Sequence, residues 1–124
     1  MQEFVEGVRI KIKECYGEKP NGSDDMGKMI NEFHTERMER IINTSGGKLV
    51  CGGKVQKDIK YCEPTVILEP KKDSELMTEE IFGPIMPIYP YKDISEAIKM
   101  IKSFDKPLCV YYFGKPHTPM MMRL

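Results

Sequence analysis

Residues 78–84 read Thr-Glu-Glu-Ile-Phe-Gly-Pro, which places a carboxylate and an aromatic ring two positions apart, just before a Gly-Pro corner. In an extended segment, residues two apart project to the same side. We therefore expect Glu80 and Phe82 to reach into one space, where they present two carboxylate oxygens beside a flat apolar face. This combination suits a sugar diol next to a planar heterocycle. The alternative is a strand residue beside a tight corner, with Phe82 in the core.

Helical patterns precede this stretch. Apolar residues recur at helical spacing from Phe4 onward, and this helix is predicted to end at Gly17. A second helix is predicted to begin at Asp24 or Asp25 and to end before Ser45. Its expected apolar stripe consists of Met26, Met29, Ile30, Phe33, Met38, Ile41 and Ile42.

Strand-like segments alternate with these helices. They are predicted at 48–51, 65–68, 85–91 and 108–113, and the last is a near-continuous apolar run typical of a strand covered on both faces. Asp93 and Glu96 fit a capping box at the start of a helix that continues to Ile101. The alternation indicates an α/β fold.

Length and composition describe one ordinary globular unit. The chain has 124 residues, of which 40% are hydrophobic and 31% are charged, enough for one modest core. Its 19 basic and 19 acidic residues give zero net charge, so nucleic acid and anionic membranes are not expected partners. No apolar run approaches the ~20 residues that span a bilayer. The first residues lack a signal-peptide pattern, so a cytoplasmic location is expected.

Residue types that build metal and nucleophilic sites are scattered. The two histidines, His34 and His117, are far apart, and no C-x-x-C pair occurs, so we predict no metal ligands. Glu79 and Glu80 are adjacent and make a poor acid–base pair, because they face opposite ways in an extended segment. Buried, inert thiols are expected at Cys15, Cys51, Cys62 and Cys109.

His34 and Arg37 form a second candidate contact. They lie three residues apart on the second predicted helix and are therefore neighbours on one face, on the polar flank of the apolar stripe. The pattern fits a solvated face, and it also fits a contact to a polar ligand.

The chain from Phe4 to about Phe113 resembles the aldehyde dehydrogenase superfamily. It is most similar to the branch of fatty-aldehyde and dimeric aromatic-aldehyde dehydrogenases. Within the matching pieces, Glu-Glu-Ile-Phe-Gly-Pro is among the more specific short signatures of the superfamily. The pieces follow in order and at similar spacing, at 13–18, 27–31, 52–53, 64–68, 79–84 and 106–108.

The resemblance implies roles for four residues. In the family, the second Glu of the signature holds the nicotinamide ribose hydroxyls and the Phe packs beside the nicotinamide, which assigns these roles to Glu80 and Phe82. His34 and Arg37 fall where family members contact the adenosine ribose region, although the family usually has an aromatic residue where Thr35 stands. The implied cofactor is NAD or NADP.

The resemblance also implies how much of the enzyme this chain represents. Residues 1–124 match the middle of the catalytic domain. The family's nucleophilic Cys, its general-base Glu and its cofactor-binding domain lie before this part, and its dimer-pairing strand and any membrane anchor lie after it. We therefore expect no catalytic residue in the chain and no activity of the chain alone.

The implied activity belongs to an intact protein. It is the NAD(P)-dependent oxidation of fatty or aromatic aldehydes to carboxylic acids by a homodimer. A non-catalytic interaction module derived from the family is the alternative, in which apolar surfaces meet a partner.

Overall fold

The computed structural model describes residues 1–113 and divides the chain into two units, Met1–Tyr89 and Pro90–Leu124. The first unit begins with α1 (Gln2–Tyr16), followed by a 3-10 turn, Pro20–Gly22. Gly17 ends α1 with a φ of 76°, which confirms the predicted boundary. Only Val5 of α1 is buried, and the Arg9 guanidinium donates a hydrogen bond to the Val50 carbonyl oxygen.

Helix α2 (Glu32–Thr44) begins later than the sequence predicted. Its cap is Asn31, whose side-chain oxygen accepts a hydrogen bond from the His34 backbone N–H at 2.9 Å, and not Asp24 or Asp25. The residues before it are not helical, and the Met29 backbone N–H donates to the Lys60 carbonyl oxygen at 2.8 Å.

The predicted apolar stripe of α2 was wrong at its first turns. Ile30 and Phe33 are 78% and 70% exposed, whereas Thr35, Met38 and Ile41 are buried. Positions 33 and 38 are five residues apart, which at 3.6 residues per turn places them about 140° apart around a helix axis. The side of α2 that carries Met38 is therefore the buried one, and Phe33 lies on another side, in solvent.

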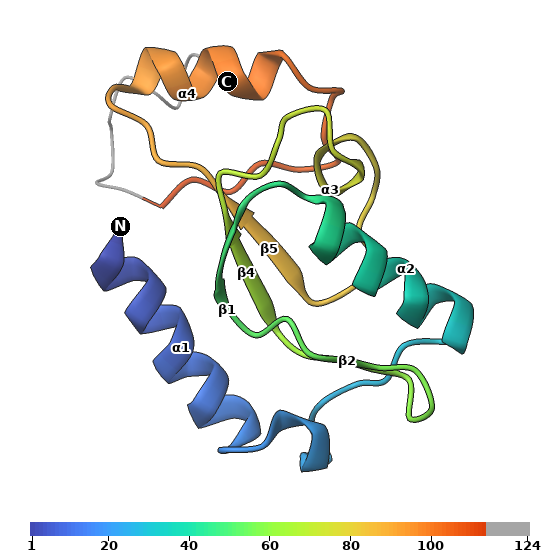
Figure 1. Cartoon of the computed structure of the whole chain (residues 1–124). Coiled ribbons are helices and arrows are strands. Elements are labelled where there is room, and N and C mark those ends of the chain that lie inside the picture. The colour runs from blue at the N-terminus through green and yellow to red at the C-terminus, as the bar shows by residue number, and fades with distance from the viewer. Residues whose placement is uncertain (114–124) are drawn as a thin grey trace. The chain divides into compact units, whose positions relative to one another are not determined.

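Five short strands form two sheets in the first unit (Figure 1). In the larger sheet, β4 (Thr65–Leu68) lies between β1 (Lys48–Cys51) and β5 (Ile85–Ile88), antiparallel to β1 and parallel to β5. The smaller sheet pairs β2 (Val55–Gln56) with β3 (Tyr61–Cys62). These findings confirm the α/β fold class and the predicted strands at 48–51 and 65–68.

The core lies between α2 and the larger sheet. Figure 1 shows α1 and α2 on opposite sides of this sheet. The short helix α3 (Glu75–Thr78) belongs to the connection that carries the chain from β4 to the parallel β5. Side chains from α2, α3 and three strands meet in one buried cluster of Met38, Ile41, Cys62, Ile67, Leu76 and Ile85.

The second unit contains α4 (Ile94–Lys102). Its cap, Asp93, accepts hydrogen bonds from the backbone N–H groups of Ser95 and Glu96, as the sequence predicted. The Glu96 carboxylate reaches back to the Lys92 N–H at 2.9 Å. The predicted strand at 108–113 was wrong: no ladder within residues 1–113 includes it, and Leu108 and Phe113 are 96% and 91% exposed. A strand needs a ladder partner to satisfy its backbone groups.

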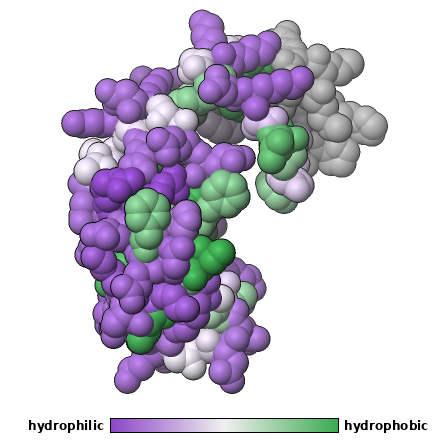
Figure 2. All heavy atoms as spheres, turned by 90° about the vertical axis from the view of Figure 1, so that its right-hand side faces the viewer, coloured by the Kyte–Doolittle hydropathy of each residue, from purple (hydrophilic) through white to green (hydrophobic). Residues whose placement is uncertain are grey.

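Large apolar side chains also reach the surface elsewhere. On the face shown in Figure 2, they emerge among hydrophilic ones. Among residues 1–113, no helix combines the length and apolar character that crossing a membrane requires.

Candidate functional site

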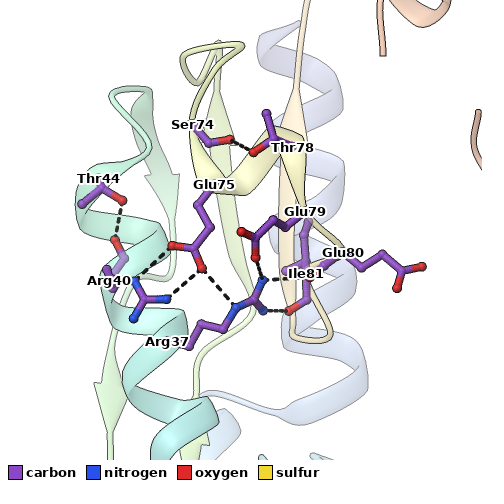
Figure 3. Close-up of polar contacts among 9 residues, drawn as sticks. All are labelled: Arg37, Arg40, Thr44, Ser74, Glu75, Thr78, Glu79, Glu80 and Ile81. Atoms are coloured by element: carbon purple, nitrogen blue, oxygen red, sulfur yellow. Dashed lines mark hydrogen bonds and ion pairs between the residues drawn. The ribbon is translucent and has the colours of Figure 1, made fainter. Parts of the chain in front are cut away.

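Glu80 and Phe82 lie in the connection between α3 and β5, which has no regular secondary structure. Glu79 is extended, with φ −126° and ψ 160°. Figure 3 shows its side chain turned toward Arg37, while the Glu80 side chain points away from Arg37. The two adjacent carboxylates therefore face different ways, as the sequence predicted, and Glu80 is exposed.

Phe82 has a left-handed backbone, with a φ of 48°. This conformation is an outlier for a bulky residue and interrupts the two-residue alternation of an extended strand. The strand argument for placing Glu80 and Phe82 on one side therefore fails at this position. Phe82 is 78% exposed, which contradicts the alternative that it belongs to the core.

Arg37 on α2 holds the backbone of this connection. Its Nη1 donates to the Ile81 carbonyl oxygen and its Nη2 to the Glu80 carbonyl oxygen, both at 2.9 Å. The Nη2 group also reaches the Glu79 carboxylate at 3.1 Å, and Nε donates to the Glu75 carboxylate at 3.1 Å. The Arg37 side chain is only 13% exposed. It therefore joins α2, α3 and the connection in one polar network (Figure 3).

Glu75 is the anchor of this network. One of its carboxylate oxygens accepts from Arg37 Nε at 3.1 Å and from Arg40 Nη2 at 2.9 Å, and the other accepts from Arg40 Nε at 3.0 Å. The hydrogen bonds and charge of Arg40, and then those of Arg37, lower the pKa of Glu75, and partial burial opposes them. The same contact raises the pKa of Arg40. Glu75 thus stays ionised between two guanidinium groups at neutral pH.

Gly83 holds the other side of the connection against the core. A Cβ atom at this position would lie 2.2 Å from the Met38 Sδ atom, and Met38 is fully buried. Only a residue without a side chain allows this approach. The connection is therefore fixed to α2 twice, by hydrogen bonds to Arg37 and by packing on Met38.

His34 lies half-buried at the start of α2. Its ring meets Phe33 edge-on, with ring centroids 5.5 Å apart, and among residues 1–113 no hydrogen bond joins it to the 79–84 connection. Four residues were assigned to cofactor binding from the sequence. Among them, the structure joins Arg37 to Glu80, by a hydrogen bond from the Arg37 side chain to the Glu80 carbonyl oxygen. His117 lies outside the described residues.

Sequence reasoning missed Glu75 and Met38, which hold this site in place, and Arg40, which contacts Glu75 but not residues 79–84. The hydrogen bonds of Arg37 and Arg40 to α3 and the connection join residues 35 to 44 positions apart, and no local pattern reports such contacts. The available signal was charge spacing. Arg37 and Arg40 lie three apart on one helix, and Glu75 and Glu79 lie four apart in the segment that faces it.

Among the cysteines, Cys62 is buried and belongs to the core cluster that contains Met38. Burial, followed by the nearby Glu63 charge, raises the pKa of the Cys62 thiol to about 11, which makes it a poor nucleophile. Cys15 and Cys109 are exposed, which corrects the expectation that all four thiols are buried. Among residues 1–113, no three His, Cys, Asp or Glu side chains gather to hold a metal ion.

Two surface pockets lie away from the connection. One, of about 440 Å³, is lined by α1 and β1 together with Leu68. The other, of about 350 Å³, lies beside Tyr61 and Lys54. Glu80 and Phe82 line neither of these two pockets. Both residues are exposed, on a backbone that Arg37 holds.

Curated relatives match most of this chain. Aldehyde dehydrogenase family 3 member F1 from Arabidopsis thaliana is 39% identical over 112 residues, which are 89% of this chain and 23% of the relative. The dimeric, NADP-preferring aldehyde dehydrogenase of Mus musculus is 38% identical, over 90% of this chain and 24% of the relative. The chain thus spans about a quarter of the length of these relatives.

Solved structures give the same result. A substrate-bound aldehyde dehydrogenase from Staphylococcus aureus matches with a TM-score of 0.87 and 32% identity, over 98% of this chain and 26% of that chain. The Mycobacterium tuberculosis aldehyde dehydrogenase complexed with NAD+ matches with a TM-score of 0.64 and 28% identity, over 80% of this chain and 22% of that one.

A family model also matches nearly the whole chain. It is described as the aldehyde dehydrogenase family and covers residues 1–120. The signature at 79–84 lies inside this match, and the structural neighbours named above are enzymes of the same family. The chain therefore belongs to the aldehyde dehydrogenase family.

Proposed function

We propose that residues 79–84 form the nicotinamide-ribose part of the cofactor site of an NAD- or NADP-dependent aldehyde dehydrogenase. One observation carries this proposal: an exposed carboxylate, Glu80, and an exposed ring, Phe82, extend from a backbone that Arg37 holds. A ribose offers two neighbouring hydroxyl donors, and a carboxylate accepts both in charge-assisted hydrogen bonds. The ring offers the planar nicotinamide an apolar surface.

The residues fit such a group by their own chemistry. Among residues 1–113, the Glu80 carboxylate takes part in none of the ion pairs or side-chain hydrogen bonds, and it points away from Arg37 (Figure 3). The left-handed backbone of Phe82 costs about 1–3 kcal/mol, and conformations of this kind cluster at ligand sites. The nicotinamide, when bound, supplies the hydride acceptor. Glu80 and Phe82 bind and orient it.

His34 and Arg37 are proposed to belong to the adenosine-ribose side of the same site. They lie one turn apart on α2, and the half-buried His34 ring stands at the beginning of that helix. Four of the five N–H groups of Arg37 donate hydrogen bonds to acceptors in the protein, which leaves one for a ligand.

For the intact protein we propose the oxidation of a fatty or aromatic aldehyde to a carboxylic acid through a thiol nucleophile and a general base. The cysteines of this chain do not suit that role. Cys62 is buried with a raised pKa, and Cys15 lies on the exposed face of α1, far in sequence from the site. We therefore propose that residues 1–124 are part of a catalytic domain and that this chain alone does not oxidise aldehydes.

A homodimer in the cytoplasm is proposed for the intact protein. The support for the dimer is the name of the mouse relative, which states that it is dimeric. The support for the cytoplasm is that Cys15, Cys51, Cys62 and Cys109 are all free thiols, as is usual in a reducing compartment.

A titration with NAD+ tests the cofactor proposal on the chain itself. We expect NAD+ to shift the backbone amide resonances of residues 79–84 in the ¹⁵N-labelled protein. Glu80→Gln is expected to weaken binding about ten-fold or more, because a hydrogen bond to a charged group contributes about 1.5–3 kcal/mol. The matched control is Glu39→Gln, an exposed carboxylate on α2 that should leave the affinity unchanged. Equal affinities of wild type and Glu80→Gln would contradict the assignment.

An assay of aldehyde oxidation tests the second part of the proposal. The purified chain is mixed with NAD+ or NADP+ and with a long-chain or an aromatic aldehyde, and reduced nucleotide is followed by absorbance. We expect none above the rate without protein. Sustained turnover by the chain would show that it supplies its own nucleophile.

A non-catalytic interaction module is a second candidate function, favoured by one observation. Ile30, just before α2, and Phe33, in its first turn, are 78% and 70% exposed. A stable, monodisperse complex with a second protein, lost in Phe33→Ser, would support this role. Aggregation of the isolated chain that Phe33→Ser relieves would support a part of a larger catalytic domain.

A further inference from the structure

We propose that Arg37 is a positioning residue that acts on the cofactor through the backbone of Glu80 and Ile81. This inference rests on the proposed function of residues 79–84. It gives Arg37 a role in addition to the ligand contact proposed above, because four of its five donors are directed at the protein.

Arg37 directs most of its N–H donors at the protein. A guanidinium group has five N–H donors in a fixed planar arrangement. Four of them have acceptors within the protein: the Glu75 and Glu79 carboxylates and the carbonyl oxygens of Glu80 and Ile81. The side chain is 13% exposed and stretched between these acceptors. Its orientation is thus set before any ligand binds.

The carbonyl groups of Glu80 and Ile81 are both bound by the Arg37 guanidinium group. They belong to consecutive residues, and each accepts from a different terminal nitrogen at 2.9 Å. A planar, rigid fork that binds both oxygens fixes the two peptide planes relative to α2. The Glu80 side chain leaves the backbone just before the first of these carbonyls, and Phe82 follows directly after the second. The fork therefore determines the directions in which the carboxylate and the ring are presented.

Arg37 is itself held by the Glu75 carboxylate. Glu75 accepts from Arg37 and also from two nitrogens of Arg40, so its carboxylate is held from both sides. Arg40 makes no hydrogen bond to residues 79–84 among the contacts of residues 1–113. The two arginines therefore share an anchor and a helix, but only Arg37 touches the segment that carries Glu80. This difference provides a matched control.

Backbone order is the first readout, and it needs no ligand. We compare wild type, Arg37→Met, Arg37→Lys and Arg40→Met by ¹⁵N relaxation. The amide order parameters of residues 80–83 are expected to fall from about 0.85 to below about 0.6 in Arg37→Met. They should remain near the wild-type values in Arg40→Met. Arg37→Lys should lie between, because one ammonium group restores charge but not the planar fork.

Affinity for NAD+ is the second readout. We expect binding about ten-fold weaker in Arg37→Met, with partial recovery in Arg37→Lys and less than a two-fold change in Arg40→Met. Weaker binding in Arg37→Met with unchanged order parameters would overturn the proposal and make Arg37 a direct ligand. Unchanged order parameters and unchanged affinity would overturn it as well.

The two readouts separate this inference from the proposed function. If wild type binds no NAD+ but Arg37→Met still loosens residues 80–83, the cofactor assignment fails and the positioning of this backbone stands. If Arg37→Met does not fold, Glu75→Gln provides the second variant, because it removes the anchor and leaves Arg37 in place. A smaller loss of order at 80–83 in Glu75→Gln than in Arg37→Lys would then support the direct role of the fork, and the reverse order would overturn it.

Discussion

Backbone ladders hold β4 on both of its edges, whereas residues 80–83 belong to no ladder among residues 1–113 and are fixed to α2 by the Arg37 guanidinium group and the contact of Gly83 with Met38. The ladders impose strand alternation, and three of the four β4 residues are at most 2% exposed. Arg37 binds the carbonyl oxygens of Glu80 and Ile81 and the Glu79 carboxylate, and it leaves the Glu80 carboxylate and the Phe82 ring in solvent. The comparison teaches that a segment which presents side chains to a ligand is better fixed by a side-chain clamp than by a ladder.

The largest expected effect is in β4. Ile67 is 1% exposed and belongs to the core cluster, so Ile67→Ala should lower the free energy of unfolding of the first unit by about 2–5 kcal/mol. Urea denaturation measures this change. Ile30→Ala, at a position 78% exposed, is the control and should stay within about 0.5 kcal/mol of wild type. A loss below 1 kcal/mol in Ile67→Ala would show that β4 is not the centre of the core.

The next largest effect is expected at Gly83, where the 79–84 connection packs on Met38. Gly83→Ala introduces a Cβ atom 2.2 Å from Met38 Sδ, so it should destabilise the first unit by about 1–3 kcal/mol through overpacking. Thermal unfolding measures the loss. Gly27→Ala is the control, because a Cβ atom there meets nothing within 4 Å. In a Met38→Ala background, which removes the Sδ atom, Gly83→Ala should cause little further loss, and this would identify the contact as the cause.

A third change separates stability from binding at Phe82. Phe82→Gly removes the strain of the left-handed backbone, which is about 1–3 kcal/mol, and adds about 0.5–1 kcal/mol of chain entropy in the unfolded state. We expect a small rise in the free energy of unfolding together with weaker NAD+ binding. Phe82→Ala should weaken binding without that rise. A loss of stability in Phe82→Gly would show that the ring packs on the protein.

The smallest effect depends on pH. The pKa of Glu75 is lowered from its ordinary value of 4.5, so its carboxylate stabilises the folded state above that pH. This contribution is lost as the pH falls through the lowered pKa. Glu75→Gln should therefore be less stable than wild type at pH 7, and the difference in their unfolding free energies should shrink below about pH 4.5. A difference that stays constant from pH 7 to pH 3 would contradict the assignment.

The sequence predicted regular elements where one local pattern decided them. Gly17 ended α1 and Asp93 capped α4, because a turn residue and a cap act within a few positions. The strand at 65–68 followed from a short apolar run between prolines. The start of α2 was wrong, because the apolar residues from Met26 to Phe33 suggested a longer helix than the phase of Met38 allows.

The sequence indicated which residues form the candidate site, but it did not indicate the contacts that arrange them. Glu80 and Phe82 stood out as a pair of chemical groups, and Arg37 stood out by its spacing from His34. Their arrangement depends on a left-handed backbone and on contacts between residues about 40 positions apart, which local patterns do not report. The strand at 108–113 was mispredicted for a related reason, because apolar composition does not supply a ladder partner.

The most direct test of the central claim is an intermolecular contact. Nuclear Overhauser effects are measured between the nicotinamide protons of NAD+ and the protein, in wild type and in Glu80→Gln. The account predicts contacts from the nicotinamide to the Phe82 ring that disappear in Glu80→Gln. Contacts only to residues outside 79–84, or contacts to Phe82 that persist unchanged in Glu80→Gln, would contradict it.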